Sequence, residues 1–131
     1  KPHHVVIGHC DWNHNTAYHR SLLERGCYIG FDGVGIDGLC PDEVRIKNIV
    51  ELTKAGFAKQ IVLSHDNIGC LHFSPGDAPA GMAASLKNPK RRYTYLLEEF
   101  IPKLRTAGAT DDTIKTLTVE NPRRYFAGES F

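Results

Sequence analysis

Two side chains able to bind a metal ion follow short apolar segments of the chain. Asp66 ends the segment 60–66, and His9 comes shortly after the β-branched segment 5–7. Such segments are typical of strands buried in a parallel sheet, and α/β proteins place their chemistry at the carboxyl ends of these strands. Zinc and similar ions bind imidazole nitrogen together with carboxylate oxygen and activate a water molecule. We therefore predict that His9 and Asp66 belong to one metal site, of which this chain holds only part.

The residues beside these two side chains favour a metal over the ordinary alternatives. A single histidine on a strand is more often a core or surface residue than a ligand, and a carboxylate after a strand often caps a turn. However, Gly8 allows close approach next to His9, and the small side chain of Ser64 leaves room for an ion beside Asp66. His65 alternates to the opposite face of its strand, so we expect a structural role for it.

A further strand, residues 27–32, ends in Asp32 and continues into a G-x-G-x-x-G motif from Gly33 to Gly38. We expect Asp32 to support the metal ligands from the neighbouring strand end. The glycine motif is that of a dinucleotide-binding unit when it opens a helix. Here Pro41 places the helix start beyond the last glycine, and Asp32 would set a carboxylate beside a pyrophosphate. A dinucleotide-binding unit is therefore the least favoured interpretation of this segment.

Strand-then-helix steps must position these residues. We expect strands at 4–9, 27–32 and 60–65, with intervening helices that end at Gly26 and Gly56. Consecutive steps of this kind call for parallel strands joined by right-handed crossovers. Pro41 suits the first turn of the second helix. The apolar stripe of that helix is formed by Val44, Ile46, Ile49, Val50 and Leu52.

The pattern changes after Asp66. Residues 67–89 are interrupted by glycine and proline and are expected to form a long loop. A helix is predicted at 92–107 with a kink at Pro102, followed by a short helix after Thr110 and a last turn that begins at Asn121. We expect the basic pairs at 91–92 and 123–124 to be solvated.

Length and composition fit one globular unit, with residues 1–131 as a single segment. The formal net charge of +1 gives no general attraction for nucleic acid or an anionic membrane, and the apolar runs are too short to span a bilayer. The four cysteines form no C-x-x-C pair, which favours reduced thiols and a cytoplasmic protein. Because three strands leave two sheet edges unpaired, we expect a segment of a larger α/β fold.

The chain resembles the C-terminal part of enzymes of the phosphotriesterase family, in the amidohydrolase superfamily. Four blocks carry the resemblance in order, at residues 6–11, 25–32, 61–66 and 119–126. The resemblance implies an α/β fold in which this chain forms strands six to eight, with their helices, of a (β/α)8 TIM barrel.

The resemblance also implies a hydrolase that binds two divalent metal ions, commonly zinc. His9 matches the sixth-strand ligand and Asp66 the eighth-strand ligand, while the ligands on strands one, four and five lie outside this chain. A metal-bridging hydroxide would attack a lactone, carboxylic ester or phosphotriester, and Asp66 would be catalytic as ligand and proton acceptor. Ile68 and Phe73 would line the substrate pocket by analogy, and the full-length protein would form a homodimer.

The chain departs from the family pattern at two positions. Lactone-hydrolysing relatives carry arginine after the strand-seven aspartate, and organophosphate-degrading members carry histidine, where this chain has Gly33. Trp12 stands where the latter members place a carboxylate for proton relay. These departures argue against a relay through strand seven, and they leave the substrate class open.

Two functional hypotheses follow from the sequence. For an enzyme, we expect the isolated 131-residue chain to bind divalent metal weakly and to catalyse no hydrolysis, because most ligands lie outside it. The alternative is a non-catalytic half-barrel, an interaction or scaffold domain whose exposed strand edges pair with another chain.

Overall fold

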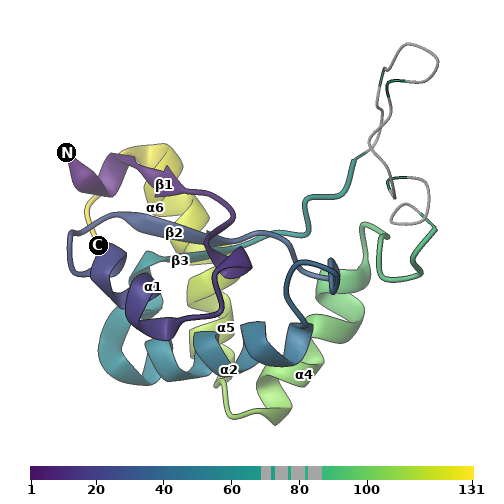
Figure 1. Ribbon diagram of the computed structural model, residues 1–131. Coiled ribbons are helices and arrows are strands. Elements are labelled where there is room, and N and C mark those ends of the chain that lie inside the picture. The colour runs from purple at the N-terminus through teal and green to yellow at the C-terminus, as the bar shows by residue number, and fades with distance from the viewer. Residues whose placement is uncertain (69–71, 73–76, 78–81, 83–86) are drawn as a thin grey trace.

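Three parallel strands form the sheet that organises the molecule. The computed structural model describes residues 1–68, 72, 77, 82 and 87–131. In this part of the chain β1 (Val6–Ile7), β2 (Tyr28–Phe31) and β3 (Ile61–Leu63) pair in the order β1-β2-β3, as predicted. Figure 1 shows β2 between its two neighbours, with α1 and α2 on one side of the strands. The three carboxyl ends therefore meet at one edge of the sheet.

The first strand is shorter than the sequence pattern suggests. Residues Pro2–His4 form a 3-10 turn, because Pro2 is well suited to the first position of a helical turn, so His4 lies outside the strand. At the other end, His9 has a left-handed backbone and Cys10–Trp12 form a second 3-10 turn. The sheet partners Val6↔Tyr28 and Ile7↔Ile29 are thus the whole of the β1–β2 pairing.

Helix α1 (Thr16–Leu23) connects β1 to β2, and α2 (Asp42–Leu52) connects β2 to β3. The side chain of Asn15 caps α1 by accepting a hydrogen bond from the Ala17 amide. Pro41 is the residue before α2 rather than part of its first turn. A wide turn (Thr53–Phe57) and a 3-10 turn (Ala58–Gln60) then lead into β3.

The C-terminal region is helical, with two wide turns. It comprises the π-helical turn Leu96–Phe100, α4 (Ile101–Thr106), α5 (Asp111–Lys115), the π-helical turn Thr116–Glu120 and α6 (Asn121–Ala127). Each of these two π-helical turns is followed two residues later by a proline, Pro102 or Pro122, which has no N–H for the regular helical hydrogen bond. The sequence predicts separate elements at 111–117 and from 121, but the structure joins them without a break.

One core fills the space between the sheet and the helices. Ile29 and Phe31 of β2 are fully buried within it. Their buried partners from the helices include Leu23, Ile49, Leu52, Phe100, Leu104 and Leu117. Tyr28 points to the other face, where its ring meets Tyr125 and Phe131 edge-on at 5.7 and 5.2 Å. This packing brings the two termini together (Figure 1).

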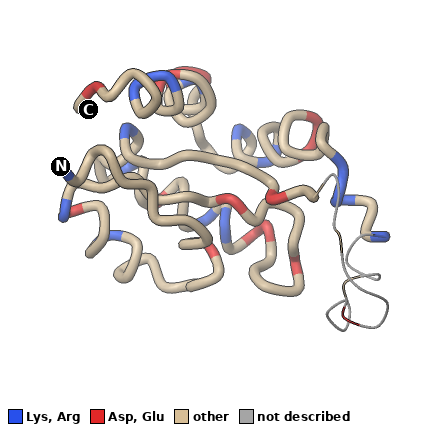
Figure 2. Tube along the Cα trace, turned by 90° about the horizontal axis from the view of Figure 1, so that it is seen from above, with Lys and Arg blue, Asp and Glu red and all other residues tan. Residues whose placement is uncertain are grey.

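Three of the four cysteines lie in described segments, and all three are buried free thiols, in line with the prediction. Burial raises the pKa of the Cys10 thiol to about 11, so this thiol is neutral and unreactive. Acidic and basic residues are interspersed along the helices and loops (Figure 2). No helix in the described part of the chain is long and apolar enough to cross a membrane.

Candidate functional site

His9 is held at the end of β1 by a carboxylate from the neighbouring strand. Its backbone amide donates to Asp32 Oδ1 and Oδ2 at 2.9 and 3.0 Å, and its Nδ1 lies 2.9 Å from Oδ1. With the proton on Nδ1, Nε2 keeps its lone pair, and Nε2 has no hydrogen-bond partner among the described residues. A carboxylate that orients an imidazole in this way is the usual support of a histidine metal ligand.

Two glycines make room for this carboxylate. A Cβ on Gly8 would lie 3.2 Å from Asp32 Oδ2, and a Cβ on Gly30 would lie 2.8 Å from it. The expected close approach beside His9 is therefore an approach of the Asp32 side chain. Trp12 stacks on the other side of the imidazole, with ring centroids 4.3 Å apart and planes 11° apart.

Asp66 follows β3 at the same edge of the sheet. It is exposed and, like His9, it has a positive φ, 43° against 54°. Arg91 donates hydrogen bonds to the backbone carbonyls of His65 and Asp66. The His65 ring packs edge-on against Tyr93 at 5.4 Å and accepts a hydrogen bond from the Asn67 amide, which fits the predicted structural role.

The structure places the two predicted ligands on the outer strands of the sheet, with β2 between them. Asp32 binds His9, and in the part of the chain that the structure describes there is no hydrogen bond between Asp32 and Asp66. The described residues contain no group of three or more His, Cys, Asp or Glu arranged to hold a metal ion. The donor chemistry of His9 therefore fits a metal, but further ligands are needed. Ile68 is half-buried, and Phe73 lies outside the described residues.

A buried ion network behind this edge was not predicted from the sequence. Arg45, Asp11 and Asp42 are all fully buried. Arg45 Nε donates to Asp11 Oδ2 at 2.5 Å, and Nη1 donates to Asp42 Oδ1 at 3.0 Å. The sequence does contain a signal for this network. Four residues lie three or four positions apart, so they share one face of α2, and all four are more deeply buried than Val44 of the predicted stripe: Asp42, Arg45, Ile49 and Leu52.

The network extends to the C-terminal region through the second carboxylate oxygen of Asp42. Tyr95 donates its hydroxyl to Asp42 Oδ2 at 2.7 Å, and Lys90 Nζ lies 3.4 Å from the same atom and 2.5 Å from Asp37. Burial alone would raise the pKa of Asp42, but hydrogen bonds from Tyr95 and Gly35 and the charges of Lys90 and Arg45 lower it overall. Burial and the bond to Asp42 raise the pKa of Tyr95 to about 12. Asp42 is therefore the ionised acceptor of the network.

The glycine motif is tied to this network. The Gly33 amide donates to Asp11 Oδ2 and the Gly35 amide to Asp42 Oδ1, both at 3.1 Å. These amides are therefore occupied by the chain's own carboxylates, whereas a dinucleotide site needs such amides for phosphate. A Cβ on Gly33 would lie 2.9 Å from Asp11 Oδ2 and 3.1 Å from Trp12 Nε1. Position 33 thus has no space for a side chain in this arrangement.

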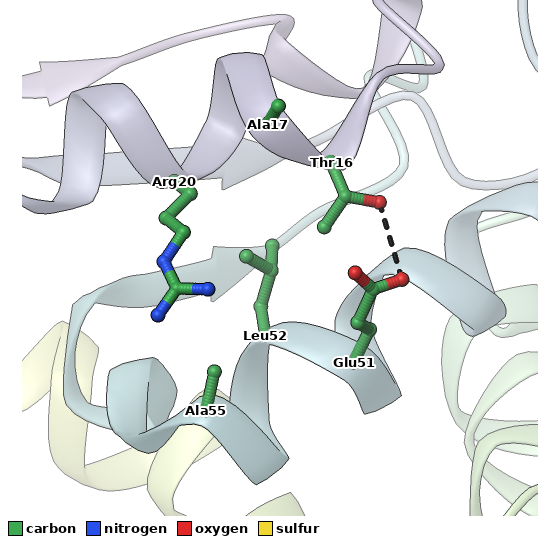
Figure 3. Close-up of a pocket in the computed structure, with 6 residues that line it drawn as sticks. All are labelled: Thr16, Ala17, Arg20, Glu51, Leu52 and Ala55. Atoms are coloured by element: carbon green, nitrogen blue, oxygen red, sulfur yellow. Dashed lines mark hydrogen bonds between the residues drawn. The ribbon is translucent and has the colours of Figure 1, made fainter.

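Two hollows lie away from the predicted ligands. A cavity of about 170 Å³ lies between α1 and α2, and Thr16 Oγ1 donates to Glu51 Oε2 beside it at 3.4 Å. Figure 3 shows its lining residues, with Arg20 and Leu52 near each other. A more open hollow of about 450 Å³ lies between α2 and α4. It is lined by Glu43, Ile46, Pro102, Lys103, Thr106 and Ala107. Neither hollow includes a predicted site residue.

Comparisons with known proteins identify the family of this chain. The model of the phosphotriesterase family matches residues 3–126. The chain is 34% identical over 122 residues to a phosphotriesterase homology protein of Mycobacterium tuberculosis, covering 93% of this chain and 36% of that protein. It is 30% identical to an aryldialkylphosphatase of Saccharolobus solfataricus (96% and 39% covered) and 28% identical to a phospho-furanose lactonase of Mycoplasmopsis synoviae (96% and 34% covered). The chain spans little more than a third of these relatives.

Solved structures agree with this picture. The phosphotriesterase from M. tuberculosis superposes with a TM-score of 0.79 at 34% identity, over 93% of this chain and 36% of that one. Organophosphorus hydrolase from Deinococcus radiodurans gives a TM-score of 0.81 at 31% identity, over 95% and 38%. These neighbours are TIM barrels, so the predicted fold class, a C-terminal part of a (β/α)8 barrel, is confirmed.

Proposed function

This chain belongs to the phosphotriesterase family, and we propose that it supplies one part of the active site of a metal-dependent hydrolase. The observation that carries the proposal is the state of His9, whose Nδ1 is held by Asp32 and whose Nε2 has no partner among the described residues. His9 shares its sheet edge with Asp66, an exposed carboxylate. Imidazole and carboxylate at the strand ends of a barrel are suited to divalent metal chemistry.

Each residue has a defined role in this proposal. His9 and Asp66 are ligands of two divalent ions, zinc by preference, whose remaining ligands lie outside this chain. When bound, the ions supply an activated water as nucleophile. Asp66 would also serve as the proton acceptor of the site, because its carboxylate is exposed at the strand end. Ile68, and Phe73 outside the described residues, are proposed to contact the substrate.

We propose an ester-type bond as the target, in a phosphotriester, a lactone or a carboxylic ester. The names of two relatives, an aryldialkylphosphatase and a phospho-furanose lactonase, support the first two substrate classes. Position 33 lacks a side chain and Trp12 lies against it, so we assign no proton relay to the segment that follows β2. Trp12, which is 42% exposed and stacks on His9, borders the site instead.

Assays of the longest natural form of the protein test this function. Zinc-loaded protein is offered aryl dialkyl phosphotriesters, γ-lactones and aryl carboxylic esters. The variants His9→Asn and Asp66→Asn are expected to lose about 100-fold or more in turnover, and to bind less metal. Asp112→Asn, an exposed change on α5, is the control and should behave as wild type. Turnover that survives both ligand substitutions would contradict the assignment.

A second function rests on the edges of the sheet. Among the described residues, β1 and β3 each pair on one side only, so both edges offer backbone groups to other strands. In this alternative the chain is a non-catalytic interaction or scaffold domain. The isolated 131-residue chain should then bind another chain and catalyse nothing. Metal-dependent hydrolysis by the natural form would favour the enzyme, whereas robust hydrolysis by the isolated chain would show that its site is complete without further ligands.

A further inference from the structure

Arg91 connects the start of the C-terminal region to the end of β3. Its Nη1 donates to the His65 carbonyl at 2.7 Å, and its Nη2 donates to the Asp66 carbonyl. Twenty-five residues separate Arg91 from Asp66 in the chain. The contact therefore joins the segment that begins at residue 87 to the residues that directly follow β3.

The backbone of Asp66 needs such support. Its φ of 43° is in the left-handed region, which a residue other than glycine keeps only where its surroundings hold it. The guanidinium group is a rigid fork of donors, so it can bind two successive carbonyls at once. Arg91 therefore fixes the turn that sets the direction of the Asp66 side chain.

Arg91 is itself held in place. Its backbone amide donates to the Asn88 carbonyl at 2.8 Å, and the neighbouring Lys90 amide donates to Asn88 Oδ1 at 2.9 Å. Lys90 Nζ binds Asp37 and Asp42 at 2.5 and 3.4 Å. The turn at residues 88–91 is thus anchored to the loop after β2 and to α2, which gives the guanidinium a fixed base.

The adjacent Arg92 has a different environment. It donates to Glu98 and Glu99, and all three side chains are 39% to 55% exposed. The sequence predicts both arginines to be solvated, and the structure gives both an intermediate exposure; what differs is the partner, backbone carbonyls after β3 for Arg91 and glutamate carboxylates for Arg92. Two consecutive arginines with such unlike contacts provide a matched pair of positions for experiment.

We propose that Arg91 is a positioning residue for Asp66, acting on the backbone turn rather than on the substrate. The proposal rests on the proposed function, in which Asp66 is a metal ligand. Without the two hydrogen bonds from Arg91, Asp66 would be free to adopt a more common backbone conformation, which would change the direction of its carboxylate. Metal affinity should therefore depend on Arg91 although Arg91 does not touch the metal.

The experiment measures divalent metal binding by the natural form of the protein, using Co²⁺ titration followed by its visible absorption and Zn²⁺ competition. Arg91→Met is expected to weaken binding about 10- to 100-fold, the range seen when a residue that orients a ligand is lost. Arg91→Lys, which keeps the charge but can meet only one carbonyl well, should fall between Arg91→Met and wild type. Arg92→Met should bind as wild type does.

The variant Asp66→Asn distinguishes a failure of the positioning proposal from a failure of the ligand assignment. If it weakens Co²⁺ binding while Arg91→Met does not, the ligand assignment stands and the positioning role is overturned. If neither change matters, or if wild type binds no Co²⁺, both proposals fail. Thermal unfolding is recorded for every variant, and a lower melting temperature with unchanged metal affinity would show that Arg91 acts on stability alone. If Arg91→Met fails to fold, Arg91→Lys decides in the same way.

Discussion

Replacing Arg45 with methionine tests the buried network most directly. The guanidinium binds Asp11 and Asp42, and all three side chains are fully buried. After its removal Asp42 keeps Tyr95 and Lys90, but Asp11 keeps only the Gly33 amide among the contacts described. Breaking a buried ion pair in this way costs about 3–5 kcal/mol. This is a large share of the 5–15 kcal/mol, roughly, by which proteins are stable.

Urea unfolding of wild type and Arg45→Met measures this cost. Lys47→Met, at an exposed position of the same helix, is the control and should change stability by less than about 0.5 kcal/mol. In the double variant Asp11→Asn/Arg45→Met the unpaired charge is gone, so part of the loss should be recovered, with a coupling of about 0.5–3 kcal/mol. A cost for Arg45→Met as small as that for Lys47→Met would refute the view that the pair is buried and intact.

Two further substitutions test the surroundings of the network. Gly33→Ala places a Cβ 3.1 Å from Nε1 of Trp12, the one tryptophan of the chain, so it should destabilise the fold by about 1–3 kcal/mol and shift tryptophan emission. Gly38→Ala, with nothing within 4 Å of its Cβ, should do neither. Tyr95→Phe removes a hydrogen bond to ionised Asp42 and should cost about 1.5–3 kcal/mol at pH 7. Because this bond lowers the pKa of Asp42 below its ordinary 3.8, the stabilisation is present above that pH and is lost as pH falls through the folded pKa. A cost for Tyr95→Phe that does not decrease at any pH below 3.8 at which the protein is still folded would contradict this assignment.

The predictable part of the molecule follows from short-range patterns. Apolar segments ending in His9, Asp32 and Asp66 predict three strands, and the helices predicted between consecutive strands call for a parallel order joined by right-handed crossovers. That order alone places the three polar residues at one edge of the sheet. The start of the second helix near Pro41 was predicted to within one residue, because the preference of proline for a helix start is local.

Contacts between residues that are far apart in the sequence could not be predicted from such patterns. The bond between Asp32 and His9 depends on the register Ile7↔Ile29 and on the space left by Gly8 and Gly30, neither of which is visible in one strand alone. The hydrogen bond between Arg91 and the Asp66 carbonyl, 25 positions earlier, joins two segments that no local pattern relates. The sequence identifies the polar groups of the edge, whereas packing decides which of them bind each other.

The buried network also joins the segments that follow the three strands. Asp11 follows β1, Gly33 and Gly35 follow β2, and Tyr95 belongs to the region after β3. The buried side chains of Asp11, Arg45 and Asp42 join these segments by hydrogen bonds. Buried ion pairs often add little stability, but an unpaired member is costly, so they favour one arrangement over its competitors. The strand ends are therefore fixed by bonds that do not involve Nε2 of His9 or the carboxylate of Asp66. Neither group has a hydrogen-bond partner among residues 1–68 and 87–131, so substitutions there should reduce metal binding without unfolding the chain.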